Sequence, residues 1–121
     1  MATSTIKPKS DRNSLAFTRV ENSYVNATDF ARIQGRYSGI IGIVNFNLVM
    51  SVNLPTGSGW VTIGTMSPKP TITATVCVPC QNNTSTILVS LETDGSVKVL
   101  NGSGQATGSN WFRASIPIYL G

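Results

Sequence analysis

Few side chains in this 121-residue chain could perform acid–base, redox or metal chemistry. Histidine is missing altogether, which removes the usual general base, the nucleophile arrangements that depend on it and most transition-metal sites. Among the five carboxylates only Glu92 and Asp94 lie close together, and Asp94 precedes Gly95 in a pair typical of a hairpin turn. We therefore expect a structural role for these carboxylates rather than the acid pair of a glycosidase. The prediction is a protein without catalytic residues, cofactor or metal site.

The two cysteines form the motif Cys77-Val78-Pro79-Cys80, which resembles a redox site. In such sites the first cysteine lies at a helix N-terminus, which lowers its pKa. Here the motif ends a predicted strand, in which residues three apart point to opposite faces and lie about 10 Å apart, beyond the ~7 Å limit for a disulfide. A single pair without histidine is also too little for zinc. We expect two reduced cysteines, with Cys80 partly buried.

The remaining candidates for binding are aromatic, arginine and asparagine side chains. Trp111 and Tyr119 share one face of the predicted last strand with Arg113, where they could stack on a sugar ring or an extended polymer. The alternative is that a neighbouring sheet or subunit covers this face, because large aromatic residues more often pack at interfaces. Three polar loops add candidates, at residues 56–58, 81–84 and 101–109. The predicted ligand-binding residues are Trp111, Arg113, Tyr119, Asn82, Asn83 and Asn101.

The longest apolar run, at residues 40–54, predicts the strand around which the fold is organised. Its even positions are apolar apart from Gly42, and its odd positions are mostly asparagine and serine. Ile41, Ile43 and Val49 interrupt this polar side, so we expect another sheet or another subunit to cover part of it.

Two further strands carry aromatic residues. Residues 110–120 alternate between apolar and polar, so we expect the C-terminus to be tied into a sheet, and Pro117 favours an edge strand or a bulge. In the strand predicted at 60–66, Val61, Ile63 and Thr65 are expected on one face.

Other strands are predicted at residues 30–37, 71–78, 87–92 and 97–99. A two-residue turn at Asp94-Gly95 joins the last two. Residues 14–28 are either irregular or a short strand, and no segment has a convincing helical period. About seven or eight strands predict an all-β sandwich or jelly roll over residues 13–121, preceded by a flexible arm or attachment segment over residues 1–12.

Composition and charge restrict the partners. The net charge is +4, but Lys7, Lys9 and Arg12 against Asp11 supply +2 of it, and no lysine- or arginine-rich run interleaves with aromatic residues. No stretch reaches the ~18 apolar residues of a membrane span, and the N-terminus lacks the apolar segment of a signal peptide. Only 12% of the residues are charged. We expect a hydroxyl- and amide-rich surface for protein or sugar partners, without nucleic-acid binding or membrane insertion.

Four segments share their order and spacing with a known class of domain: Gly59–Thr65 (GWVTIGT), Pro68–Pro70 (PKP), Thr93–Val99 (TDGSVKV) and Trp111–Ile116 (WFRASI). This order of a strand, a proline-containing loop, a hairpin and a terminal strand resembles the C-terminal head domains of tail fibres and baseplate receptor-binding proteins of tailed phages. The resemblance covers about residues 30–120.

The resemblance implies a β-sandwich head that forms a homotrimer, lacks catalysis, and attaches the virion, by its tail or baseplate, to saccharides on the host cell surface. It transfers no binding residue, because saccharide sites in such heads vary and often lie at subunit boundaries. The long stalk of a full fibre is missing, so the chain is either an excised domain or a short protein that joins other virion proteins through residues 1–12. The alternative is a structural virion component in the baseplate, tail tip or capsid, whose exposed aromatic residues serve assembly.

Trimerisation also has a physical motive in the sequence. Ile41, Ile43 and Val49 on the long strand, with Trp111 and Tyr119 on the last, would leave apolar surface on a monomer. A closed three-fold arrangement would cover it.

Overall fold

The computed structural model describes residues 13–50, 53–57, 59–82 and 84–121. The arm predicted at residues 1–12, the predicted ligand residue Asn83 and the side chain of Val49 lie outside the described part.

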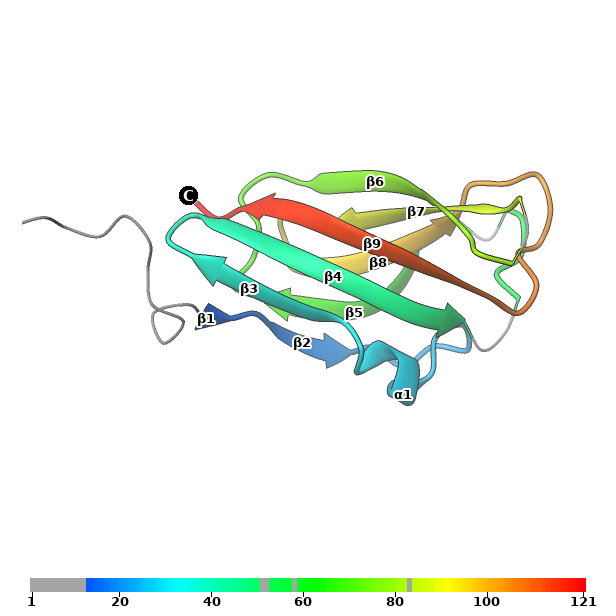
Figure 1. The fold of residues 1–121 in the computed structure, drawn as a ribbon, viewed down its shortest axis with the longest axis horizontal. Helices are drawn as coiled ribbons and strands as arrows, with labels where there is room; N and C mark the ends of the chain where they lie inside the picture. The colour runs from blue at the N-terminus through cyan, green and yellow to red at the C-terminus, as the bar shows by residue number, and fades with distance from the viewer. Residues whose placement is uncertain (1–12, 51–52, 58, 83) are drawn as a thin grey trace, which may run out of the picture.

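Antiparallel strands dominate the described residues and form two sheets (Figure 1). In order of pairing, the first sheet contains β1 (Asn13–Ser14), β3 (Gln34–Ser38), β4 (Ile41–Met50) and β9 (Asn110–Tyr119). The second contains β2 (Ala16–Arg19), β5 (Val61–Ser67), β8 (Ser96–Asn101), β7 (Thr86–Leu91) and β6 (Ala74–Pro79). A single short helix, α1 (Ala27–Phe30), precedes β3 in these residues. The predicted all-β sandwich is confirmed, with nine described strands in place of seven or eight.

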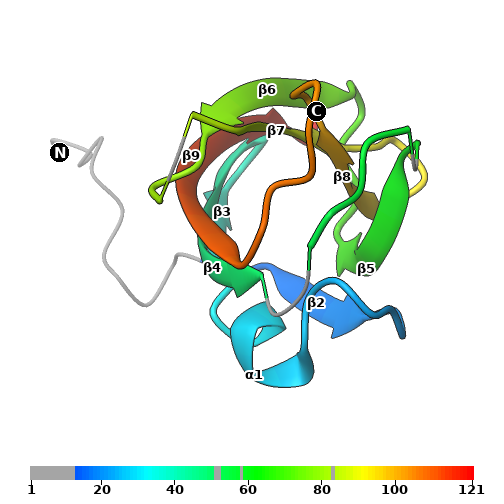
Figure 2. The same ribbon diagram turned by 90° about the vertical axis from the view of Figure 1, so that its right-hand side faces the viewer.

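The two sheets face each other and approach closely at both edges, so the end view resembles a flattened barrel (Figure 2). At one edge the chain passes from β1 to β2, and thus between sheets, within the single residue Leu15. At the other edge, two backbone amides that flank β6 donate hydrogen bonds to β9. The Gln81 amide donates to the Trp111 carbonyl oxygen and the Thr71 amide to the Tyr119 carbonyl oxygen, both at 2.9 Å. The last strand is therefore the edge strand expected from Pro117, and the facing sheet protects that edge.

The second sheet contains a Greek key. Strands β6, β7 and β8 follow one another as neighbours, and β5 lies beside β8. Between β7 and β8 the predicted hairpin is present, but its turn has three residues, 93–95, because the Glu92 amide still donates to the Ser96 carbonyl. Gly95 has a φ of 90°, a value that glycine adopts without steric cost.

The core lies between the sheets and follows the predicted alternation. Val44, Phe46 and Leu48 of β4 are buried, and the rings of Phe46 and Phe112 lie 6.2 Å apart. On the facing sheet the alternating residues of β7 and β8 are fully buried: Ile87, Val89, Leu91, Val97 and Val99. Each such side chain contributes roughly 1.5–3 kcal/mol through its transfer from water.

The strand expected at 60–66 is interrupted by a bulge. Its pairing with β8 shifts register between Thr62 and Gly64. The inserted residue reverses the sides of the sheet to which the following side chains point. Ile63 and Met66 are therefore both buried, while Thr65 is exposed. The prediction that Thr65 shares a face with Ile63 was wrong for this reason.

Two segment boundaries also differ from the predictions. The strand expected at 30–37 begins at Gln34, because Asn26 caps α1 by accepting a hydrogen bond from the Asp29 amide at 2.8 Å. The strand expected at 71–78 begins at Ala74, since the Thr71 amide bonds to β9 and Ile72 is left 62% exposed.

Close packing at Gly64 yields a test of this arrangement. A Cβ atom added there would collide with the ring of Phe30 and lie 2.8 Å from the Thr18 carbonyl oxygen. We expect Gly64→Ala to lower the free energy of unfolding by about 1–3 kcal/mol, because Phe30 or β2 must shift. The control is Gly104→Ala, where no atom lies within 4 Å of the added carbon. Denaturant titration of both variants is the measurement, and equal stabilities would contradict the packing of Phe30 on β5.

Candidate ligand-binding face

The outer face of the β1-β3-β4-β9 sheet presents side chains to solvent along β4 and β9. Pairing of β4 with β9 over ten residues places Asn45 opposite Ser115 and Asn47 opposite Arg113. All four side chains are exposed. The hydroxyl of Ser115 lies 2.7 Å from the Asn45 side-chain oxygen, which joins the two strands on this face.

A groove opens on the same face, between the sheet and the segment that includes β2 and α1. It has a volume of about 730 Å³, and Gln34, Arg36, Asn45 and Ser115 line its polar part. Phe17, Phe30 and Ile33 are among its apolar lining residues. A shallower hollow of about 430 Å³ adjoins it, with Asn45 and Ser115 in common, and extends to Asn47 and Arg113. We call the two together the polar groove.

Trp111 and Arg113 form one unit at the end of this face, as their spacing predicted. The guanidinium carbon of Arg113 lies 5.1 Å from the centre of the Trp111 ring, within cation–π range. The predicted loop residue Asn82 lies near them, because its amide donates to the Asn110 side chain at 3.0 Å. The structure therefore brings Trp111, Arg113 and Asn82 to one end of β9.

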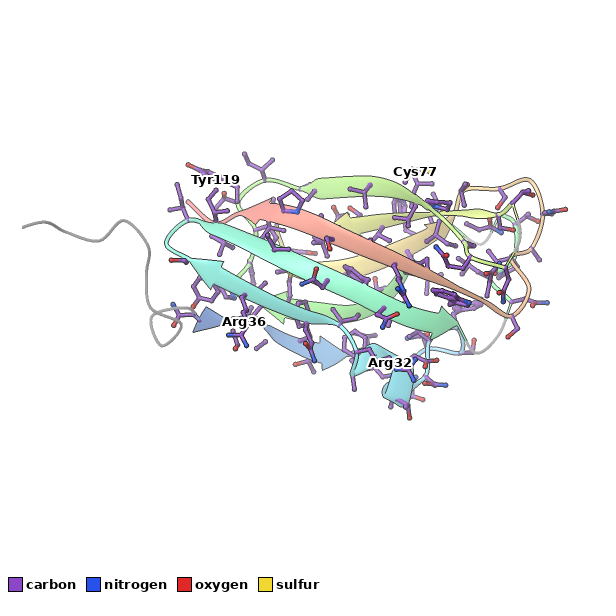
Figure 3. All side chains as sticks on the ribbon, in the orientation of Figure 1. Arg32, Arg36, Cys77 and Tyr119 are labelled. Carbon is purple, nitrogen blue, oxygen red and sulfur yellow. The ribbon has the colours of Figure 1, made fainter. Side chains whose placement is uncertain are left out.

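Tyr119 lies at the other end of β9, although the sequence places it on the same face. It lies eight positions after Trp111, a distance of about 26 Å in an extended strand. It pairs with Ile41 and is 39% exposed. Figure 3 shows it at the end of β9 that leads to the C-terminus. Trp111, Arg113 and Tyr119 therefore share one face of β9, as predicted, but are spread along the strand. A single sugar ring cannot contact both aromatic residues, and binding of an extended polymer by the group stays a prediction.

Asn101, a predicted ligand-binding residue, lies in a buried, hydrogen-bonded environment that favours a structural role. It is only 9% exposed, and its side-chain amide donates to the carbonyls of Leu54 and Gln105, at 2.9 and 2.8 Å. Its side-chain oxygen accepts from the amide and hydroxyl of Ser103. An asparagine followed by Gly-Ser is typical of such a turn, a signal that the sequence contained.

The closest pair of carboxylates in the sequence, Glu92 and Asp94, interacts with other residues of the β7–β8 hairpin. Asp94 accepts from the Ser96 amide at 2.8 Å, and this backbone hydrogen bond lowers the pKa of Asp94. Glu92 accepts from the Ser90 hydroxyl and lies 3.5 Å from the Lys98 ammonium. Both carboxylates thus have the structural role expected of them.

Both cysteines are free thiols, as predicted. Cys77 is exposed on β6, whereas Cys80 is buried and donates its backbone amide to the Ser85 carbonyl. Burial raises the pKa of the Cys80 thiol, which opposes the thiolate that redox chemistry requires.

Within the described ranges, no group of three or more cysteine or acidic side chains is arranged to hold a metal ion. None of their helices is long and apolar enough to cross a membrane. Comparison with family models, with curated proteins and with solved structures finds no match.

Four polar residues that line the groove were not among the predicted ligand-binding residues: Gln34, Arg36, Asn45 and Ser115. Asn45 and Ser115 belong to alternating polar positions, which indicated exposure but not a groove. Seventy residues separate them, so only the pairing of β4 with β9 brings them together.

The role of Asn101 can be tested by an isosteric substitution. Asn101→Asp removes both amide donors and points a carboxylate at two carbonyl groups, so we expect the free energy of unfolding to fall by about 1–3 kcal/mol. Asn47→Asp, at an exposed position, should change it by less than about 0.5 kcal/mol. Thermal and denaturant unfolding of both variants provide the comparison, and an unaffected Asn101 variant would restore this residue as a ligand candidate.

Proposed function

We propose that this chain is a non-enzymatic adhesion head of a phage receptor-binding protein, and that it recognises saccharide on the bacterial cell surface. The observation that carries the proposal is the polar groove, which is open and extends toward the Trp111–Arg113 unit. Amide, hydroxyl and guanidinium groups line it, and these groups match the hydroxyl donors and acceptors of sugars. Virions would carry the protein on the tail or baseplate and use it at the host surface.

The environment of the carboxylates supports a binding role without catalysis. Glycoside hydrolysis requires two carboxyl groups facing the scissile bond. Among the described residues no carboxylate lines the polar groove, and Glu92 and Asp94 belong to a hairpin of the other sheet.

An apolar surface at the opposite end of the face supports the proposed homotrimer. Four large side chains around the start of β4 and the end of β9 are 39–54% exposed, and Ile72 beside them is 62% exposed. We call this set the apolar end: Ile40, Ile41, Ile43, Ile72 and Tyr119. Subunits that bury it in a three-fold contact would place the polar groove, which shares Ile43, near their boundary.

The same apolar end favours a second candidate, a structural virion component without receptor binding. In that case the apolar end would contact other virion proteins, and the polar groove would have no saccharide ligand.

Saccharide binding decides between the candidates. We expect the purified protein to bind glycans on an array and whole host cells. The substitutions Asn45→Ala and Ser115→Ala together should weaken that binding about tenfold, since each removes a groove hydrogen bond. Thr65→Ala, at an exposed position of β5, is the control. Binding that the groove variants do not affect would move the site elsewhere, and no binding at all would favour the structural role.

Solution mass tests the oligomeric state. Light scattering on the peak from a size-exclusion column should give three times the chain mass of 12.8 kDa. Ile41→Thr with Ile43→Thr keeps the β-branched shape but adds hydroxyls to the apolar end, so these substitutions should shift the mass toward the monomer. Trp60→Thr changes an exposed aromatic residue outside the apolar end and should leave the mass unchanged. A monomeric unsubstituted protein would contradict the trimer.

A further inference from the structure

Two arginines lie on the outer face of the β1-β3-β4-β9 sheet, one toward each end of the polar groove. Arg36 of β3 lines its deeper part and is exposed (Figure 3). Arg113 of β9 lines the shallower part. From their registers with β4, the backbone positions of the two arginines lie about 16 Å apart.

Polar side chains connect the two arginines without interruption. Asn45 and Ser115 line both parts of the groove, and their side chains lie 2.7 Å from one another. Gln34 extends the polar lining on the Arg36 side, and Asn47 extends it on the Arg113 side. An extended chain of linked units could therefore contact both arginines while it crosses amide and hydroxyl groups.

The positive charge of this surface is not compensated in the described part of the chain. The ion pairs there join Arg19 to Glu21, Arg32 to Asp29 and Lys98 to Glu92. Among the described carboxylates, Asp29 is the one adjacent in sequence to a groove-lining residue, Phe30. It is buried, and its carboxylate lies 3.6 Å from the Arg32 guanidinium. Arg36 and Arg113 thus present charge to whatever occupies the groove.

The geometry points to an anionic polysaccharide as the ligand, held along the polar groove with its negative groups at Arg36 and Arg113. This inference rests on the proposed saccharide-binding function and names the substrate class. Guanidinium groups bind carboxylate and phosphate alike, in two parallel hydrogen bonds. The shared chemistry is therefore an oxyanion borne on a sugar polymer, either as a uronate or as a phosphodiester.

The composition of the groove favours a saccharide over a nucleic acid. Nucleic-acid faces gather many lysine and arginine residues and expose aromatic platforms for base stacking. Here two arginines are separated by neutral amides and a hydroxyl, and the Trp111 ring is half-buried with Arg113 over it.

Binding assays on the full chain with four polymers test the inference. Alginate carries carboxylates, poly(glycerol phosphate) teichoic acid carries phosphates, dextran is neutral, and single-stranded DNA is the competing class. We expect tight binding of alginate or teichoic acid, weaker by about five- to tenfold in each of Arg36→Gln and Arg113→Gln. Added salt should weaken it further, because salt screens exposed charges. Lys69→Gln is the control, with the same charge change at a residue that lines neither part of the groove.

The outcomes distinguish failure of the anionic ligand alone from failure of the proposed function. Preference for alginate assigns a uronate, preference for teichoic acid assigns a phosphate, and either supports the inference if the arginine variants bind less. Dextran binding equal to that of the charged polymers, or a loss in Lys69→Gln as large as in the arginine variants, overturns the anionic ligand but leaves saccharide binding intact. Tighter binding of DNA overturns the inference as well. If no polysaccharide binds, both the inference and the proposed function fail.

Discussion

Pairing of β4 with β9 is the interaction on which the rest of the structure depends. Its ten-residue register joins segments about seventy positions apart and aligns the alternation of both strands, so one side of the pair is core and the other is open surface. Val44, Phe46 and Phe112 meet the second sheet on the inner side. A slip of one residue would exchange the two sides of β9 and expose Phe112. The inner packing therefore specifies the register, and the register in turn determines which side chains meet outside.

The outer side of this pair is divided along its length by chemistry. Apolar residues gather where β4 begins and β9 ends, while amide, hydroxyl and arginine side chains occupy the middle and the far end. Among the described residues no sheet covers the apolar end, so of the two covers expected for this side, another sheet or another subunit, the second stays a prediction. Apolar area of this kind favours association with another surface. The adjacent polar groove remains open to a ligand, so assembly and recognition can use neighbouring parts of one face.

Local deviations from the regular pattern show where tertiary structure overrides alternation. The bulge in β5 exchanges faces within one strand, and Gly64 beside it is the one residue type in 61–66 that signals a bulge. The α1 turn depends on the Asn26 cap, and a search for helical periods misses it because four residues make about one turn and cannot repeat the 3.6-residue pattern. Ile72 fits the alternation of the following strand, but the Thr71 amide bonds to β9 and removes that segment from β6. In each case a single hydrogen bond or an inserted residue outweighs the side-chain pattern.

The sequence by itself determined the all-β class, the long strand and its buried parity, the terminal edge strand with Pro117, the hairpin at Gly95 and the reduced cysteines, because these depend on the order of side chains along the chain. It also indicated that Trp111 and Arg113 lie together, since every second residue of a strand points to the same face. Only the tertiary structure decided that Asn45 meets Ser115, that Tyr119 belongs to the apolar end, and that Asn101 anchors a loop. Those outcomes depend on strand register and loop closure between distant segments, which alternation does not encode.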